Sequence, residues 1–255
     1  MKVTTSHASG FAPAFICSAL AMLGGCANPT GTLTIIQNQK PTVDDSGACV
    51  VSSDSSQVPS SDGLFDVDLD RAYPYYVFPL IQNRLPSLKT AGGIERNAIV
   101  LHHVEVTVQA PPGVNPGWDP RCPGTFELGA SAVLDPTQSR AFRIEGMQMC
   151  HAQRLRELIS EGAIPADTNQ PVYFTLQLTA VATRSGDEQR SDPFPFQVQV
   201  CAGCLQSMYP TVPLCTDAPK PNPFRGNPCN IAQDFGQVLC CKDPSDKLVC
   251  PAPDV

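Results

Sequence analysis

Cysteine places the strongest limit on how this chain can fold. Twelve of the 255 residues are cysteines, and seven of them lie within residues 201–255. This density is higher than the ~8–10% that marks a disulfide scaffold. Prolines are also frequent there and no hydrophobic period is sustained, so the segment cannot bury enough apolar surface to fold unaided. We predict that this C-terminal segment is cross-linked to itself, to the preceding domain, or to both.

The N-terminal residues have the pattern of a secretory signal. Phe11–Leu23 carries no charge and is shorter than the about 20 apolar residues that span a bilayer. Lys2 supplies a small positive region before it, and Gly24 and Gly25 are the small residues that a signal peptidase requires near its cut. We therefore expect residues 1–25 to be a signal peptide and the protein to be exported.

The sequence Leu23-Gly24-Gly25-Cys26 resembles the lipobox of bacterial lipoproteins. The resemblance implies that the Cys26 sulfur receives a diacylglyceryl group, that the chain is cut before Cys26, and that the new amino group is acylated. Two or more acyl chains anchor a protein durably, at about 0.8 kcal/mol for each buried CH₂. Cys26 is then a membrane anchor and not a catalytic thiol, with residues 26–30 as the lipidated tether. Ala27 stands where an Asp signals inner-membrane retention in the best-known Gram-negative scheme, which favours the outer membrane.

Ten cysteines remain when Cys17 leaves with the signal and Cys26 takes the lipid. An even number in an exported protein indicates a disulfide framework. The candidates are Cys49, Cys122, Cys150, Cys201, Cys204, Cys215, Cys229, Cys240, Cys241 and Cys250. The sequence does not choose among their pairings. Since Cys240 and Cys241 are neighbours and a bond between them would close a strained ring, we predict that they bond to different partners.

The charge balance excludes some partners. Without residues 1–25 the chain has 17 − 1 = 16 Lys and Arg against 24 Asp and Glu, a net charge of 16 − 24 = −8. No run of Lys or Arg is present, which argues against nucleic acid as a partner and against electrostatic docking on anionic lipid. The expected contact with the membrane is through the lipid anchor alone.

The hydrophobic pattern after residue 30 is mainly that of strands, with a period of two. The expected strands are 31–39, 48–51, 64–70, 75–85, 98–109, 125–134, 141–147, 172–183 and 194–200. A polar loop is expected at 52–63, a turn at 185–188, and a single helix at Cys150–Ile159 with Gly162 as its C-terminal cap. We predict an all-β fold over residues 31–200, an antiparallel two-sheet sandwich of immunoglobulin-like architecture, with a barrel as the alternative. Residues 201–255 would form a disulfide-rich extension.

Cys201-Ala-Gly-Cys204 follows a predicted strand, as a redox motif would. Thioredoxin-type chemistry needs the first thiolate at a helix N-terminus, but Pro210 and Pro213 stand where that helix would run. Zinc is another reading of this spacing, yet no histidine follows Cys201 and exported thiols tend to oxidise. Structural disulfides are favoured, and we expect no metal site.

Asp66-Val-Asp68-Leu-Asp70 imitates the first residues of a calcium loop. Such a loop needs Gly at its sixth position and Glu at its twelfth, where this chain has Arg71 and Val77. The stretch Leu64–Asp70 alternates apolar and acidic residues. We therefore favour a half-buried antiparallel strand whose aspartates face water, and keep calcium between loops as the alternative.

The histidines give no catalytic or metal site. His102 and His103 are adjacent within a predicted strand, so their rings should point to opposite faces, one inward and one toward water. His151 follows Cys150, but neighbours on a helix point about 100° apart, and a bridged Cys150 is favoured. No catalytic motif such as G-x-S-x-G, H-E-x-x-H or a P-loop is present.

Two aromatic features are candidate recognition surfaces. Tyr73, Tyr75, Tyr76 and Phe78 alternate along a predicted strand, which favours core and rim positions. Trp118 lies in a Pro/Gly-rich loop, where it would either contact a ligand or cover Cys122.

The layout as a whole resembles cysteine-rich envelope lipoproteins of unknown function. We expect a structural or adhesive protein without catalytic residues or cofactor, whose partner is an envelope protein or a glycan. The alternatives are a substrate- or carbohydrate-binding module that serves an envelope enzyme or transporter, and a secreted hydrolase.

Overall fold

The computed structural model describes most of the chain after residue 30. The described residues are 31–69, 72–88, 95–165, 170–206, 212–218, 226, 229–230, 232–234 and 236–250. The predicted signal peptide, the lipobox with Cys26, the tether 26–30 and Asp70 lie outside them. Within the described residues strands predominate, and one helix is present.

The largest sheet has six strands in the order β5-β14-β12-β8-β9, with β13 paired to the far end of β12. Their bounds are β5 Asp62–Asp66, β8 Ile99–Gln109, β9 Thr125–Leu134, β12 Val172–Arg184, β13 Asp187–Arg190 and β14 Phe194–Cys201. All neighbours are antiparallel except β5 and β14, which are parallel. The expected antiparallel strand at Leu64–Asp70 is therefore wrong in its pairing. The turn expected at 185–188 is shorter in the structure, where Ser185 and Gly186 alone join β12 to β13. Both residues have positive φ, as a two-residue hairpin turn requires.

A second sheet has the order β10-β7-β1-β4, and a short pair joins β11 to β6. The bounds are β1 Leu33–Gln39, β4 Pro59–Ser60, β6 Tyr75–Val77, β7 Pro79–Asn83, β10 Ser139–Ala141 and β11 Ile144–Met147. The single strand expected at 75–85 is thus two strands, which part at Phe78. The strand expected at 141–147 is likewise two, and the polar loop expected at 52–63 contains β4 and the start of β5.

The helix α1 spans Met149–Ser160, one residue longer at each end than predicted. Its last turn closes on Gly162, whose φ of 74° is the left-handed conformation that glycine adopts without strain. The amide of Ala163 donates to the Leu158 carbonyl at 2.8 Å, as in a Schellman cap. Arg156 ties the helix to the chain after β5, because its guanidinium donates to the carbonyls of Val67 and Leu69 at 2.7 and 2.6 Å.

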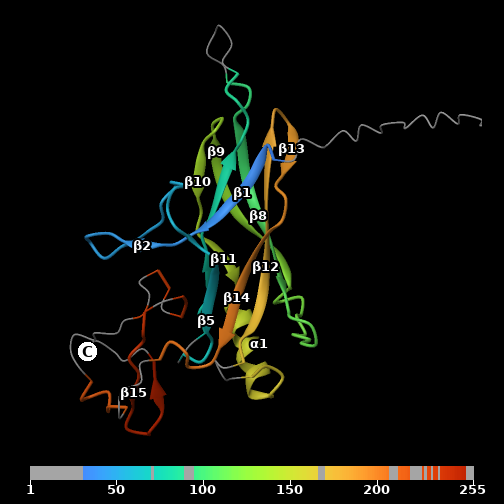
Figure 1. Ribbon diagram of the computed structural model, residues 1–255. Coiled ribbons are helices and arrows are strands. Elements are labelled where there is room, and N and C mark those ends of the chain that lie inside the picture. The colour runs from blue at the N-terminus through green and yellow to red at the C-terminus, as the bar shows by residue number, and fades with distance from the viewer. Residues whose placement is uncertain are drawn as a thin grey trace, which may run out of the picture.

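The main core takes side chains from both larger sheets and from the helix. In Figure 1, β1 crosses in front of β8 and β12, and β1 also contacts β12. The alternating inward residues of β8 and β12 are fully buried; they are Val104, Val106, Leu176, Leu178 and Ala180. The same core takes in Leu155 and Leu158 of α1. Two further short pairs complete the structure: β2 Thr42–Val43 with β3 Cys49–Val50, and β15 Cys241–Lys242 with β16 Leu248–Val249.

The ten cysteines predicted to be cross-linked are joined in five disulfides. The pairs are Cys49–Cys229, Cys122–Cys150, Cys201–Cys204, Cys215–Cys241 and Cys240–Cys250. Cys240 and Cys241 have different partners, as predicted. The C-terminal segment is therefore linked both to itself and, through Cys229, to Cys49 of β3, 180 residues earlier in the sequence. Figure 1 shows this segment beside the lower half of the sheets.

Candidate functional site

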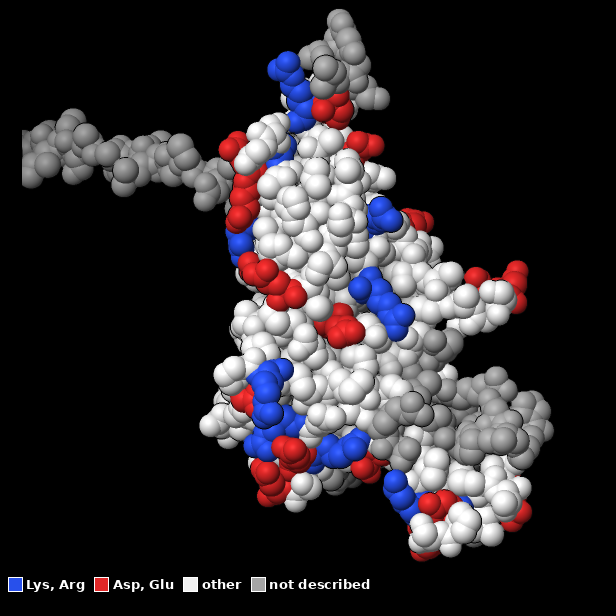
Figure 2. Space-filling view, turned by 180° about the vertical axis from the view of Figure 1, so that it is seen from behind, with Lys and Arg blue, Asp and Glu red and all other residues white. Residues whose placement is uncertain are grey.

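The outward face of the six-stranded sheet carries a regular set of polar side chains. Alternation along each strand sends one set of side chains into the core and the other outward. The outward set on β8, β12 and β14 consists of Thr107, Gln109, Tyr173, Thr175, Gln177, Thr179, Gln197 and Gln199. We call these residues the polar face. Figure 2 shows the molecule from behind, where charged side chains are sparse across the middle and gather near the helix end and along the edges.

The register of the strands brings the polar side chains into rows. Thr107 lies opposite both Gln177 of β12 and Thr125 of β9, and the two threonine hydroxyls are 3.0 Å apart. Thr175 lies between Gln109 and Gln197. A shallow cavity of about 370 Å³ opens on this face between β8 and β12. Its lining of hydroxyl, amide and carboxylate groups suits a polar ligand bound by hydrogen bonds.

At one end of the polar face the rows become charged. Glu105 lies directly opposite Glu127 in the register, and the Nε2 atom of His103 is 3.9 Å from Glu105 Oε1 and 3.8 Å from Glu127 Oε2. The guanidinium of Arg190 pairs with the other oxygen of Glu105. The sequence did not reveal this group, because Glu127 and Arg190 come from strands whose register no local pattern fixes.

The prediction that His102 and His103 point to opposite faces is wrong. The register of β8 shifts between Leu101 and His103, which is the mark of a β-bulge with one extra residue. Leu101 and Val104 are buried while both histidines between them lie toward solvent. His102 contacts the Thr183 hydroxyl at 2.9 Å through Nε2, so neither ring enters the core.

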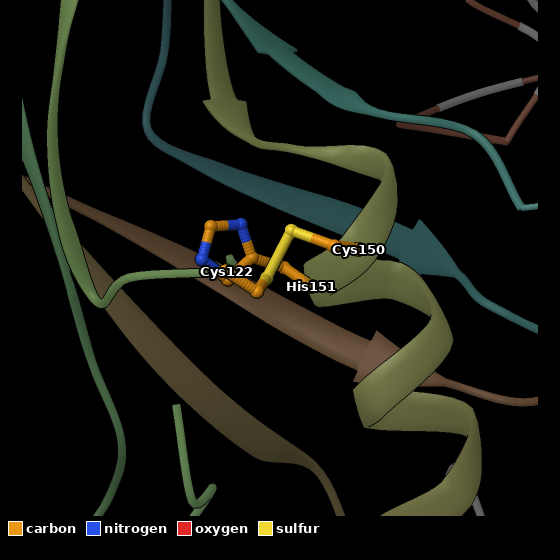
Figure 3. Close-up of side chains that lie close together, drawn as sticks. All are labelled: Cys122, Cys150 and His151. Carbon is orange, nitrogen blue, oxygen red and sulfur yellow. A yellow bond between two sulfur atoms is a disulfide. The ribbon is translucent and has the colours of Figure 1, made fainter. Parts of the chain in front are cut away.

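Cys122, Cys150 and His151 lie together where the loop before β9 meets the start of α1 (Figure 3). The two sulfurs form a disulfide. The buried ring of His151 accepts the Gln148 amide at Nδ1, 2.9 Å away, so its proton is on Nε2, which contacts the Pro123 carbonyl at 3.1 Å. Burial lowers the pKa of His151, which keeps the ring neutral. Both nitrogens are engaged, so this group is a structural junction and offers no free metal ligand.

Trp118 packs against the same junction. Its ring meets the His151 ring edge to face at 4.7 Å, and its Nε1 atom donates to the Val108 carbonyl at 3.4 Å. A cavity of about 350 Å³ beside it is lined largely by Asp119, Arg121, Arg154 and Glu157. The half-buried indole therefore packs on His151 and lines the same cavity as Cys122 and Cys150.

The prediction that Asp66 faces water is wrong. Its side chain is buried, and its carboxylate accepts the amides of Asp68, Gly203 and Leu205 at 3.0, 2.8 and 2.9 Å. Two of these amides belong to the loop that contains Cys204. Burial raises the pKa of Asp66 although the three amides act in the opposite direction. With its oxygens occupied by amide donors, Asp66 holds the Cys201–Cys204 loop and is not arranged as a calcium ligand.

The C-terminal segment joins β5 through backbone hydrogen bonds and β6 through side chains that replace backbone partners. The buried Gln233 accepts the Tyr76 amide at 2.7 Å and donates to the Tyr76 carbonyl at 3.0 Å. Asp234 accepts the Tyr75 hydroxyl at 2.7 Å, and its own amide donates to the Leu64 carbonyl at 2.7 Å. Among the described residues every buried side-chain nitrogen and oxygen has a hydrogen-bond partner. No local pattern in the sequence marks Gln233 or Asp234 for this role.

The predicted core and rim positions of the aromatic cluster are confirmed. Tyr75 and Phe78 are buried, while Tyr73 and Tyr76 are half-buried. The Arg143 guanidinium lies over the Tyr76 ring at 3.8 Å. The cluster therefore belongs mainly to the packing of the β6–β7 segment and presents little aromatic surface.

No protein-family model matches the chain, and a search of curated proteins finds no match. Within the described residues, no helix combines the length and the apolar character needed to cross a membrane.

Proposed function

We propose that this protein is an exported lipoprotein of the bacterial cell envelope, anchored by lipid on Cys26, that has a structural or adhesive role and performs no catalysis. The observation that carries the proposal is the pairing of all ten cysteines after Cys26 in five disulfides. Disulfides persist in oxidising compartments and are rare in the cytosol. The lipobox and the cysteine pairing are independent features, and each favours export.

We further propose that the two larger sheets are the layers of an immunoglobulin-like β-sandwich. The switch at Phe78 supports this arrangement, because the chain passes from the β6–β11 pair to the β7–β10 pair without a loop. The two short pairs can then be read as one continuous layer opposite the six-stranded sheet, with the main core between the layers. Residues 201–255 would serve as a cross-linked extension of this domain.

The experiment that tests the envelope role is lipid labelling of Cys26→Ser. The full-length chain, expressed in a Gram-negative host with labelled palmitate, should incorporate label and fractionate with the outer membrane. Cys26→Ser should lose the label and accumulate as an uncleaved or mis-sorted precursor. Cys17→Ser, a cysteine within the predicted signal, is the matched control and should label normally. Equal labelling of Cys26→Ser and the unchanged chain would refute the lipid anchor.

A glycan-binding role is the second candidate, favoured by the polar face. Its hydroxyl and amide side chains are uncharged hydrogen-bonding groups in rows, the chemistry that would bind a neutral polysaccharide. Affinity electrophoresis in neutral envelope polysaccharides should show retardation that Gln177→Ala reduces. Gln153→Ala, on the exposed side of α1, is the control and should be retarded normally. No retardation of the unchanged protein would leave the structural role alone.

A further inference from the structure

We propose that His103, Glu105 and Glu127 form a binding site for a divalent zinc-like cation at the charged end of the polar face. One ligand atom from each of the three side chains lies within 4.8 Å of the other two. The ligands come from two adjacent strands, so the sheet itself sets their spacing. The inference does not depend on the lipid anchor or on a glycan partner.

The pairing of the two glutamates is the first argument. Glu105 and Glu127 are direct cross-strand partners, and like charges directly opposite each other destabilise a sheet. Both carboxylates lie on the outward side, with 28% and 67% of their side-chain surfaces exposed. A cation between them would turn this repulsion into attraction. His103 provides an imidazole nitrogen on the same side, two residues before Glu105.

The orientation of Glu105 is the second argument. Arg190 binds Oε2 of Glu105, whereas Oε1 is the oxygen directed at the imidazole of His103. Arg190 also reaches Glu188 at 3.4 Å and so bridges two carboxylates of different strands. This second contact holds the guanidinium against Glu105 and leaves Oε1 available to a metal. Arg190 is therefore a positioning residue for the proposed site.

The distances fit a site that closes slightly on binding. Tetrahedral zinc with ligands at about 2.0–2.2 Å places neighbouring ligand atoms about 3.4 Å apart. The observed His103–carboxylate distances are 3.9 and 3.8 Å, and all three ligand atoms lie within 4.8 Å of one another. The His103 contacts therefore need to shorten by about half an ångström, and the two carboxylates need to approach each other by about 1.4 Å at most. The exposed Glu127 on an edge strand is free to make these movements. One imidazole and two carboxylates suit zinc and neighbouring first-row ions better than calcium, which takes oxygen ligands.

The other side chains that commonly bind zinc are already engaged in this protein. Cysteine thiolates are strong zinc ligands, but the ten cysteines of the described residues are all in disulfides. The buried ring of His151 has both nitrogens engaged, and His102 contacts Thr183. Of the histidines that the structure describes, His103 is the one whose nearest side-chain partners are two carboxylates.

Isothermal titration calorimetry of the disulfide-bonded protein with Zn²⁺ tests the site. The unchanged protein should bind one zinc ion, and both His103→Ala and Glu127→Gln should weaken binding about tenfold or more, because loss of even an outer-shell partner of a metal ligand typically costs tenfold to 100-fold in affinity. His102→Ala is the matched control, because it removes the neighbouring imidazole of the same bulge, and its affinity should be unchanged. Binding of Co²⁺ followed by visible absorption gives a second readout, which should report nitrogen ligation only when His103 is present.

Several results would overturn the proposal. These are an absence of zinc binding by the unchanged protein, equal affinity in His103→Ala, and an equal loss in His102→Ala. The three side chains lie on the solvent side of the sheet, so the variants should stay folded without metal. His103→Ala should keep the thermal unfolding midpoint of the unchanged protein, and Glu127→Gln should keep or raise it, because it removes the repulsion between two opposed carboxylates. Should Glu127→Gln nevertheless unfold, Glu127→Ala replaces it, and zinc affinity undiminished in that variant would also count against the site.

Discussion

The β sheets and the C-terminal segment of this protein are stabilised in different ways. In the sheets, long strands bury alternate aliphatic side chains in one continuous core. The C-terminal segment adds few side chains to this core, namely Ala232, Val238, Cys240 and Cys250, and its separate cluster consists of Ala218, Leu239 and Cys241. Disulfides and hydrogen bonds supply its other described links. The comparison shows how one chain can combine sheets that fold by burial with a segment in which covalent and polar contacts supplement a small apolar contribution.

The largest expected loss of stability follows removal of the disulfide that joins the two regions. Removing Cys49–Cys229 by Cys49→Ser with Cys229→Ser opens a loop of 180 residues, which the chain-entropy model values at about 5 kcal/mol of unfolding free energy. Urea denaturation at neutral pH, with the remaining disulfides verified by mass spectrometry, measures the loss.

The matched control for that experiment is Cys240→Ser with Cys250→Ser. It opens a loop of 10 residues within the C-terminal segment, and the same model expects a loss of about 2.7 kcal/mol. Equal losses of unfolding free energy in the two double variants would contradict this expectation. They would show that the disulfide between the regions contributes no more to stability than a disulfide within the C-terminal segment.

The sheets could be predicted to a large extent, because their strands carry their own signals. The strands at 33–39, 99–109 and 125–134 and the helix at 149–160 fall where hydrophobic periodicity places them. Their flanking Gly and Pro residues and the spacing of Leu155 and Leu158 are local features, and each is readable without knowledge of the partner strand.

The contacts between the regions could not be predicted, because they depend on which strands are neighbours. Asp66 reads as a solvent-facing residue in an alternating strand, and it becomes buried because β5 is parallel to β14 and is covered by residues 203–205 and 232–234. The bulge at His102 likewise has no signal in the local sequence, because the strand around it is rich in β-branched residues. The candidate metal ligands share this limit, since they meet through register and not through spacing in the sequence.

Gln233 provides the second prediction, on the polar link between the regions. Gln233→Ala leaves both backbone groups of Tyr76 without their partners, and an unsatisfied buried group costs about 1–3 kcal/mol, so we expect a loss of about 2–4 kcal/mol. Gln206→Ala is the control, because Gln206 donates to one exposed carbonyl, that of Asp68. Urea unfolding should separate the two variants clearly, and a negligible loss in Gln233→Ala would show that the disulfides alone hold the segment.

A substitution at Gly63 tests how closely β5 packs against Tyr75. A Cβ atom at this position would lie 1.8 Å from the Tyr75 hydroxyl, which is itself bonded to Asp234. Gly63→Ala should therefore cost about 1–3 kcal/mol through overpacking. Gly129→Ala in β9 is the control, since a Cβ there meets nothing within 4 Å, and it should leave the thermal midpoint unchanged or raised. A neutral Gly63→Ala would mean that the Tyr75–Asp234 contact is not needed to hold the segment.

The smallest expected effect is the opposite pH response of buried and exposed aspartates. Burial raises the pKa of Asp66 above 3.8, so the folded state binds this proton more tightly than the unfolded state does. Its contribution to stability is greatest below the unfolded pKa and declines as pH rises through the folded pKa. Asp44 behaves in the opposite way, because the Ser46 hydroxyl and the Ala48 amide lower its pKa, and its contribution is lost as pH falls.

Urea unfolding of Asp66→Asn and Asp44→Asn at several pH values between about 3 and about 7 separates these contributions. Asp66→Asn places an amide donor among the three backbone amides that the carboxylate accepts, so its absolute stability falls at every pH and the slope is the informative quantity. Stability should rise more steeply with pH in Asp66→Asn than in the unchanged protein, and less steeply in Asp44→Asn. Parallel profiles of stability against pH for the two variants would mean that the carboxylate of Asp66 is as well solvated as that of Asp44. The hydrogen bonds between Asp66 and the Cys201–Cys204 loop would then be exposed to water instead of forming part of the packed interior.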